Sequence, residues 1–275
     1  MPFTMSHAAA VLPLARGPLV PSALVVGSMV PDVPYFFGLA TLRGATHSPW
    51  GLVTIDLMFG VFFFAVFHLV WKRPLLALTP GRAHARLAEP AYGFRRAMIK
   101  WVPLSVVVGA ATHLFWDAFT HEHHSFAGAF PWLITTSWGG LALNRWLQYA
   151  SGLLGAVAVA WWLVRWSRTA SVMADAPARL PRRTVLSVVG AVALATCGGA
   201  LLGAILLINQ PDLPRTFHMT LVSGVEGGIA GFALALTVYG LAWTAAMRRR
   251  AREAPVADPG ERADLPRATA GQLDD

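Results

Sequence analysis

The sequence has few charged residues and a single cysteine. Of its 275 residues, 13% are charged and 55% are hydrophobic. Soluble domains carry about 25% charged residues, so this composition excludes an ordinary soluble domain and indicates a membrane protein. Cys197 has no second cysteine to pair with, which excludes an intramolecular disulfide and a cluster of thiolate metal ligands. Any metal here must therefore be held by histidine and carboxylate side chains.

Several functional motifs are also missing. The chain contains no P-loop, no dinucleotide fingerprint and no G-x-S-x-G nucleophile elbow, so neither a nucleotide-binding enzyme nor a serine hydrolase is supported. Prolines and an arginine interrupt the N-terminus where a secretory signal needs a continuous apolar core, and we expect no cleaved segment. The net charge of +8 comes from basic residues beside apolar runs, so we expect no nucleic-acid partner.

Five apolar runs are long enough to cross a bilayer, which takes about 20 residues. They cover residues 50–71, 101–119, 146–164, 184–208 and 221–247. The predicted fold is all-α: a polytopic membrane helical bundle of about five transmembrane helices, with short helices and loops in the N-terminal segment. We divide the chain into an N-terminal segment (residues 1–49), the bundle (residues 50–247) and a disordered basic tail (residues 248–275).

The basic residues alternate across the predicted membrane. Of the 22 Lys and Arg residues, 18 lie in residues 72–100, in residues 165–183 and in the tail. The positive-inside rule places these three segments in the cytoplasm. Residues 1–49, 120–144 and 209–220 then face outward. We expect a multi-pass protein of a bacterial inner membrane, with its N-terminus outside and its C-terminus in the cytoplasm.

Ionisable side chains gather at the outward end of the second run. The sequence THLFWDAFTH places His113, Asp117 and His121 at steps of four, on one face of a helix. Ionisable groups inside a membrane usually face a cavity or a partner and mark function. Imidazole and carboxylate are natural ligands of zinc and similar divalent ions, and the i, i+4 spacing lets His113 and Asp117 converge on one ion. For His121, a helix end that meets water is an equal alternative.

A single helix cannot close a metal site, because a tetrahedral ion needs three or four ligands from more than one segment. The outward N-terminal segment offers His7, Asp32 and His47. Pro31 and Pro34 are expected to hold Asp32 in an extended turn that does not join a helix. Together these segments predict a site for one or two divalent metal ions, with zinc as the expected metal.

Other residues leave alternatives open. His218 and Glu226 lie two helical turns apart near the outward end of the fifth run and are a further candidate to cap the site, whereas His84 lies in a cytoplasmic loop and is excluded. Gly199 and Gly203, four residues apart, permit close approach of helices in lipid. That approach joins either the fourth and fifth runs or two copies of the chain.

Three blocks of the sequence resemble an uncharacterised bacterial family of integral membrane proteins, known as a domain of unknown function, over roughly residues 1–245. They are PFTMSHAAAVLPLARGPLVPSALVVGSMVPDVPYFF, ATHS and HLFWDAFTH. More distantly, the same order of residues is similar to membrane-bound metal-dependent hydrolases and to zinc-dependent phospholipase C. This similarity implies metal ligands at His7, Asp32, His47, His113, Asp117 and His121. The chain lacks the additional His-x-x-x-Glu pair of those phospholipases, so one or two ions are expected rather than three.

These residues predict a membrane-bound metal-dependent hydrolase that acts on a phosphodiester or ester of a lipid-type substrate at the outer membrane face. A metal ion lowers the pKa of a bound water and polarises the scissile group. As catalytic residues we expect Asp32 to bridge two ions, and Asp117 to ligate one ion and orient the water. Two alternatives stay open: a non-catalytic membrane scaffold with a structural or lost metal site, and an ion or small-solute transporter.

Overall fold

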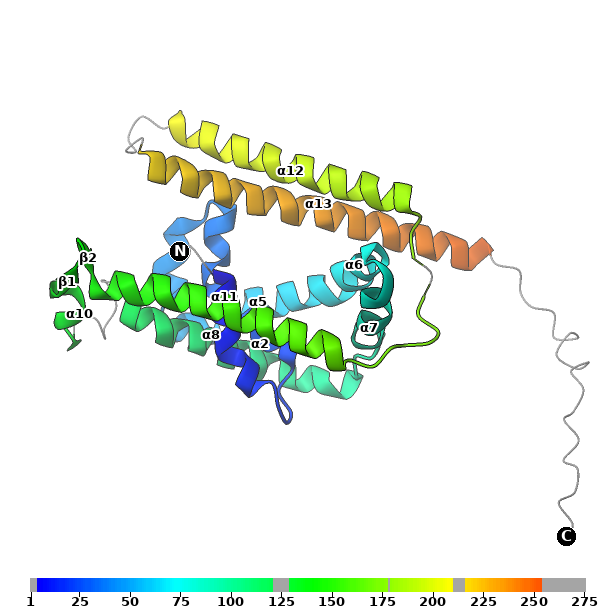
Figure 1. Ribbon diagram of the computed structural model, residues 1–275, viewed down its shortest axis with the longest axis horizontal. Coiled ribbons are helices and arrows are strands. Elements are labelled where there is room, and N and C mark those ends of the chain that lie inside the picture. Colours follow the sequence, from blue (N-terminus) through cyan, green and yellow to red (C-terminus); the bar gives the residue numbers. More distant parts are fainter. Residues whose placement is uncertain (1–3, 121–128, 178, 210–215, 254–275) are drawn as a thin grey trace, which may run out of the picture.

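The fold is almost entirely helical (Figure 1). The computed structural model describes residues 4–120, 129–177, 179–209 and 216–253. Within these residues, five helical segments are long and apolar enough to cross a membrane. They are Ile55–Leu78, Arg96–Thr120, Leu143–Thr169, Arg182–Ile208 and Met219–Glu253. The predicted five-span helical bundle is therefore confirmed.

Short helical turns make up the N-terminal segment. They are η1 (Thr4–His7), α1 (Ala8–Val11), η2 (Leu12–Leu14), α2 (Pro21–Gly27), η3 (Val30–Phe37), η4 (Ala40–Leu42), α3 (Arg43–Thr46) and α4 (Pro49–Val53). The expected extended turn around Asp32 is wrong, because Asp32 lies in the 3-10 helix η3. Proline in the first turn of a helix costs no hydrogen bond, so Pro31, the second residue of η3, joins this helix instead of preventing it.

The spans are built from longer helices. The first span joins α5 (Ile55–Val66), a π-helical turn η5 (Phe67–Trp71) and α6 (Lys72–Leu78), and α7 (Gly81–Tyr92) follows it. The other spans comprise η6 (Arg96–Trp101) with α8 (Val102–Thr120), then α11 (Leu143–Thr169), α12 (Arg182–Ile208) and α13 (Phe217–Glu253). Before α11 lie α10 (Trp132–Thr135) and an antiparallel pair of strands, β1 (Ser137–Trp138) and β2 (Leu141–Ala142).

Two of the basic segments meet at one end of the bundle, where α6 and α7 lie (Figure 1). The buried His84 of α7 bridges the carbonyl oxygens of Leu76 and Pro177, at 2.9 and 2.7 Å. The amide of Met173 also donates to the carbonyl of Ala85, at 3.0 Å. Residues 72–100 and 165–183 therefore share one end of the bundle, as the distribution of basic residues requires.

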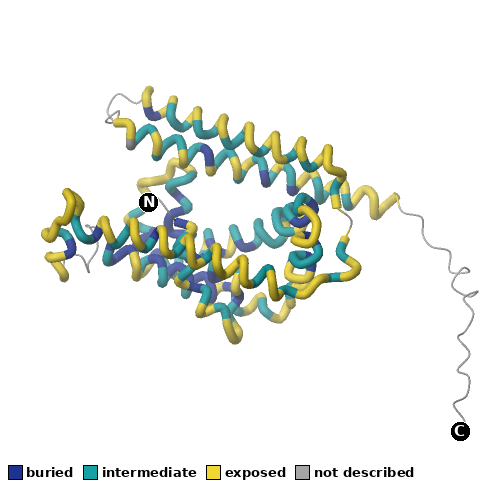
Figure 2. The backbone as a smooth tube through the Cα atoms, viewed as in Figure 1, coloured by how far each residue is buried: buried dark blue, intermediate teal, exposed yellow. Residues whose placement is uncertain are grey.

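The core lies where α2 packs against α5 and α8. Val20, Ala23, Phe64, Val102 and Val106 form one buried cluster there. Figure 2 shows that buried residues concentrate in this part of the molecule, while the long helices α11, α12 and α13 carry many exposed residues. Their exposed residues include large apolar side chains, as a surface that faces lipid requires.

Small residues join α12 to α13, which lie side by side (Figure 1). A Cβ atom on Gly199 would overlap the carbonyl oxygen of Gly227, and one on Gly203 would overlap that of Ser223. Of the two alternatives for this glycine spacing, the structure thus shows packing between the fourth and fifth spans. Helix α13 continues to Glu253, beyond the end of the bundle that we predicted, and residues 254–275 lie outside the described part of the chain.

The glycine contact predicts a stability difference between two substitutions in α12. Gly199→Val should destabilise the protein by about 1–3 kcal/mol, since overpacking a tight contact costs that much. Gly190→Val is the matched control, because a Cβ at Gly190 meets nothing within 4 Å. Thermal unfolding in detergent measures both, and equal midpoints for the two variants would contradict this account of the α12–α13 contact.

Candidate metal centre

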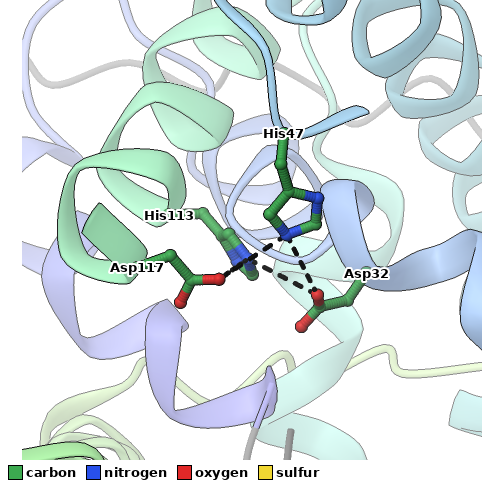
Figure 3. A group of neighbouring side chains, drawn as sticks. All are labelled: Asp32, His47, His113 and Asp117. Atoms are coloured by element: carbon green, nitrogen blue, oxygen red, sulfur yellow. Dashed lines mark ion pairs between the residues drawn. The ribbon is translucent and has the colours of Figure 1, made fainter. Parts of the chain in front are cut away.

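Four ionisable side chains converge inside the bundle (Figure 3). Asp32 comes from η3, His47 follows α3, and His113 and Asp117 lie one turn apart in α8. One ligand atom from each residue lies within 4.8 Å of the other three. Two segments that are separated by more than sixty residues in the sequence thus supply one cluster.

The distances within this cluster suit a metal ion better than direct hydrogen bonds. His47 Nε2 lies 3.5 Å from both Asp32 Oδ1 and Asp117 Oδ2, and His113 Nε2 lies 3.6 and 3.5 Å from the same two atoms. A direct N–H···O bond spans about 2.7–3.2 Å. Tetrahedral ligands at about 2.0–2.2 Å from an ion are separated by roughly 3.3–3.6 Å. The four histidine–aspartate distances therefore match edges of such a coordination shell, and the other two pairs of ligand atoms lie within 4.8 Å.

His113 is held in the tautomer that a metal ligand needs. Its Nδ1 lies 2.9 Å from the carbonyl oxygen of Ser28, which can only accept a hydrogen bond. Nδ1 therefore carries the proton, and in the neutral ring the lone pair of Nε2 points into the cluster. His113 is fully buried, and within the described residues neither its Nε2 nor Asp32 Oδ1 has a hydrogen-bond partner.

His47 is oriented through a hydroxyl group. The Thr46 hydroxyl donates to the carbonyl of Pro31 at 3.0 Å, so its oxygen is available to accept from His47 Nδ1 at 3.1 Å. A proton on Nδ1 again leaves the lone pair of Nε2 facing the two carboxylates. Both histidines are thus fixed by outer partners, which is typical of metal-binding imidazoles.

The two carboxylates differ in what their second oxygen contacts. Asp32 Oδ2 accepts a hydrogen bond from the Thr4 hydroxyl at 2.8 Å, so one oxygen of Asp32 remains for the cluster. Asp117 Oδ2 faces the cluster, while its Oδ1 lies 3.8 Å from His7 Nε2. The ring of His7 stacks on that of His113, with centroids 4.0 Å apart. His7 therefore lies beside the four-residue cluster, next to the outer oxygen of Asp117.

Close packing of α2 on α8 brings the Ser28 carbonyl to His113. A Cβ atom on Gly27 would overlap the backbone of Val106, and one on Gly109 would overlap the carbonyl of Leu24. Because both positions are glycine, the two helices approach closely enough for the end of α2 to reach the His113 ring. The glycines thus contribute to the site without contacting it.

The electrostatics of the cluster favour a bound cation. Burial acts to raise the pKa of Asp32, but the imidazoles of His113 and His47 outweigh it and hold the pKa well below its usual range. Burial acts to lower the pKa of His47, but Asp117 and Asp32 outweigh it and raise the pKa. The carboxylates thus attract positive charge, and a divalent ion that binds here would displace protons from the imidazoles.

The predicted site residues fall into three groups. Asp32, His47, His113 and Asp117 come together, and His7 lies beside them. His121 lies outside the described residues. Glu226 lines a different cavity, of about 1290 Å³, between η3, α12 and α13, and the side chain of His218 is not among those described.

Sequence reasoning missed the outer partners of the cluster. Thr4 and Thr46 hydrogen-bond to the cluster residues Asp32 and His47. Thr46 directly precedes His47 in the ATHS block, and this adjacency is the sequence feature from which its role could have been predicted. Asp56, in the first span, is also fully buried, and neither of its carboxylate oxygens has a hydrogen-bond partner among the described residues.

The fold and the cluster define a class: a five-span helical membrane protein with two histidines and two aspartates buried together. The chain belongs to the family described as Domain of unknown function (DUF4184), whose model matches residues 1–241. Predicted membership in an uncharacterised membrane family is thus confirmed, and all four cluster residues lie in the matched region. No curated protein and no solved structure matches the chain, so the similarity to hydrolases stays a prediction.

The outer partner of His47 generates a test of the metal centre. Thr46→Val keeps the size of the side chain but removes the hydroxyl that orients the ring, so zinc affinity should fall about 10–100-fold. Thr54→Val is the matched control, since that hydroxyl donates to the carbonyl of Trp50 at an exposed position. Competition with a chromophoric chelator measures both affinities. Equal affinities in the two variants would contradict the assigned role of Thr46.

Proposed function

We propose that the protein is a membrane-bound metal-dependent hydrolase that cleaves a phosphodiester or ester of a lipid-type substrate at the outer membrane face. One observation carries the proposal: two buried imidazoles, each oriented by an outer partner, face two buried carboxylates at the spacing of a coordination shell. This donor set suits one or two divalent ions, with zinc as the expected metal.

The ligands and the proton-handling groups are assigned from the geometry. Asp32, His47, His113 and Asp117 would hold the ion, which when bound supplies an activated water and polarises the scissile group. Asp117 Oδ1 and His7 Nε2 lie together on the other side of that carboxylate, where they are placed to orient a water and to accept its proton. Because Thr4 occupies Asp32 Oδ2, Asp32 would hold an ion through Oδ1 alone, whereas Asp117 has a second oxygen next to His7.

The position of the cluster along α8 supports a site at the outer membrane face. His113 and Asp117 lie in the last turns of α8, whose opposite end follows the basic residues Arg96 and Lys100. If the basic end is cytoplasmic, as the positive-inside rule requires, the cluster lies toward the outer side. The phosphodiester and ester bonds of a membrane lipid lie near that interface, within reach of the site.

A structural metal site in a non-catalytic scaffold is the second candidate. Four protein ligands fill a tetrahedral shell, and closed shells are typical of structural zinc sites, whereas catalytic sites keep an open position. Catalysis at this site would therefore need a fifth ligand position or a shift of the Asp117 carboxylate toward His7. Among the described residues, no specific observation favours the transport alternative.

An assay of hydrolysis tests the proposal. Zinc-loaded protein in detergent should cleave bis(p-nitrophenyl) phosphate and phospholipid in mixed micelles, and a chelator should abolish both activities reversibly. His113→Ala and Asp117→Asn should lose at least about 100-fold in rate, because each removes a proposed ligand. Asp175→Asn, an exposed carboxylate between the third and fourth spans, is the control and should keep the wild-type rate.

Two outcomes would overturn parts of the proposal. Protein that binds zinc and loses stability without it, yet cleaves neither substrate, would be a structural metalloprotein. The side of the membrane that carries the site is tested with whole cells that express the protein. These cells should cleave a membrane-impermeant phosphodiester that is added outside. Cleavage only after permeabilisation would place the site on the cytoplasmic side.

A further inference from the structure

A second cavity opens beside the metal centre, with a volume of about 580 Å³. Its walls come from η1, α1, α8 and α11. Most of the lining is apolar, and it includes Ala9, Ala10, Val108, Ala111, Phe115 and Gly152. The volume lies within the range of about 300–1,000 Å³ that is typical of small-molecule sites.

This cavity lies between two membrane spans. Val108, Ala111 and Phe115 belong to the second span, and Gly152 and Gly155 belong to the third. A Cβ atom on Gly155 would crowd the backbone of Ser6, so this glycine lets the N-terminal turns pack directly on α11. One wall of the cavity is therefore formed by the same N-terminal segment that supplies candidate ligands to the metal centre.

One end of the cavity is polar and touches the metal centre. Asp117 and His7 both line it, and Asp117 directs its other oxygen into the four-residue cluster. Nearby, Trp116 Nε1 donates to Ser151 Oγ at 3.0 Å and links α8 to α11. The cavity thus combines apolar walls along the two spans with a carboxylate and an imidazole at its end.

We propose that this cavity is the subsite for one hydrocarbon chain of a membrane lipid substrate. The chain would lie between α8 and α11, and the scissile linkage would lie at Asp117 and His7. A hydrocarbon chain fits because the walls are apolar and lie in membrane spans, and a single cavity of this size seats one chain. The inference rests on the proposed hydrolase function for its catalytic consequence, but occupancy by a lipid chain is testable without it.

Filling the cavity tests the proposal. Ala111→Phe on α8 and Ala10→Phe on α1 narrow it from two different helices and leave the four cluster residues in place. Ala158→Phe is the matched control, because Ala158 is exposed on α11 and does not line the cavity. Zinc content should be unchanged in all three variants, which shows that each has folded with its metal centre intact.

The first readout is independent of activity. Protein in phosphatidylglycerol vesicles that contain a phospholipid with a diazirine on one acyl chain should crosslink at Val108, Phe115 and Trp116, which line the cavity. In both cavity-filling variants the yield of this crosslink should fall at least about tenfold, and in the control variant it should equal that of wild type. Undiminished crosslinking in Ala111→Phe and Ala10→Phe would overturn the proposal.

The second readout separates the subsite from the chemistry. Cleavage of a long-chain phospholipid should fall at least about tenfold in the filled variants, while cleavage of the small soluble phosphodiester stays within about twofold of wild type. An equal loss of cleavage on both substrates would overturn the proposed chain subsite but not the proposed hydrolase function. If wild-type protein cleaves neither substrate, the proposed hydrolase function is wrong. The crosslink alone then decides whether a lipid chain occupies the cavity.

Discussion

The burial of two carboxylates and two imidazoles inside an apolar bundle is the constraint on which the structure depends. Asp32, His113 and Asp117 are at most 2% exposed. An unpaired charge in such a place costs several kcal/mol, so these groups need one another and, on our account, a cation. The outer contacts of Thr4, Thr46 and the Ser28 carbonyl then fix which atoms of Asp32, His47 and His113 face the cluster.

This constraint explains the shape of the N-terminal segment. Its short turns are too small to be stable alone, yet they carry His7, Asp32 and His47 to the last turns of α8. The glycines at 27 and 109 permit that approach, and η1 and α1 then lie between the four-residue cluster and α11. The same segment thereby forms one wall of the neighbouring cavity. Metal binding, docking of the N-terminal segment and formation of the cavity are coupled on this account.

Much of this arrangement was predictable from the sequence, because hydropathy sets the spans and helical periodicity puts His113 and Asp117 on one face. Charge bias predicted Asp32 and His47 on the same side of the membrane as the end of α8 that carries His113 and Asp117. The cluster that these residues form requires this. Local rules failed at Asp32, because Pro31 lies in the first turn of a 3-10 helix that contains Asp32. Local rules also predicted His7 as a metal ligand equal to the four cluster residues, because positions in a sequence do not show how far apart the side chains lie. The roles of Thr4 and the Ser28 carbonyl depend on tertiary contacts that no local pattern encodes.

The central claim is that these four side chains form one metal centre, on which the proposed hydrolysis depends. Zinc K-edge X-ray absorption of the purified, zinc-loaded protein tests it most directly. We predict a first shell of nitrogen and oxygen only, at about 2.0–2.2 Å, with the outer-shell scattering of two imidazoles, one of which disappears in His47→Ala. A protein that binds no zinc, or a spectrum that His47→Ala leaves unchanged, would contradict the account.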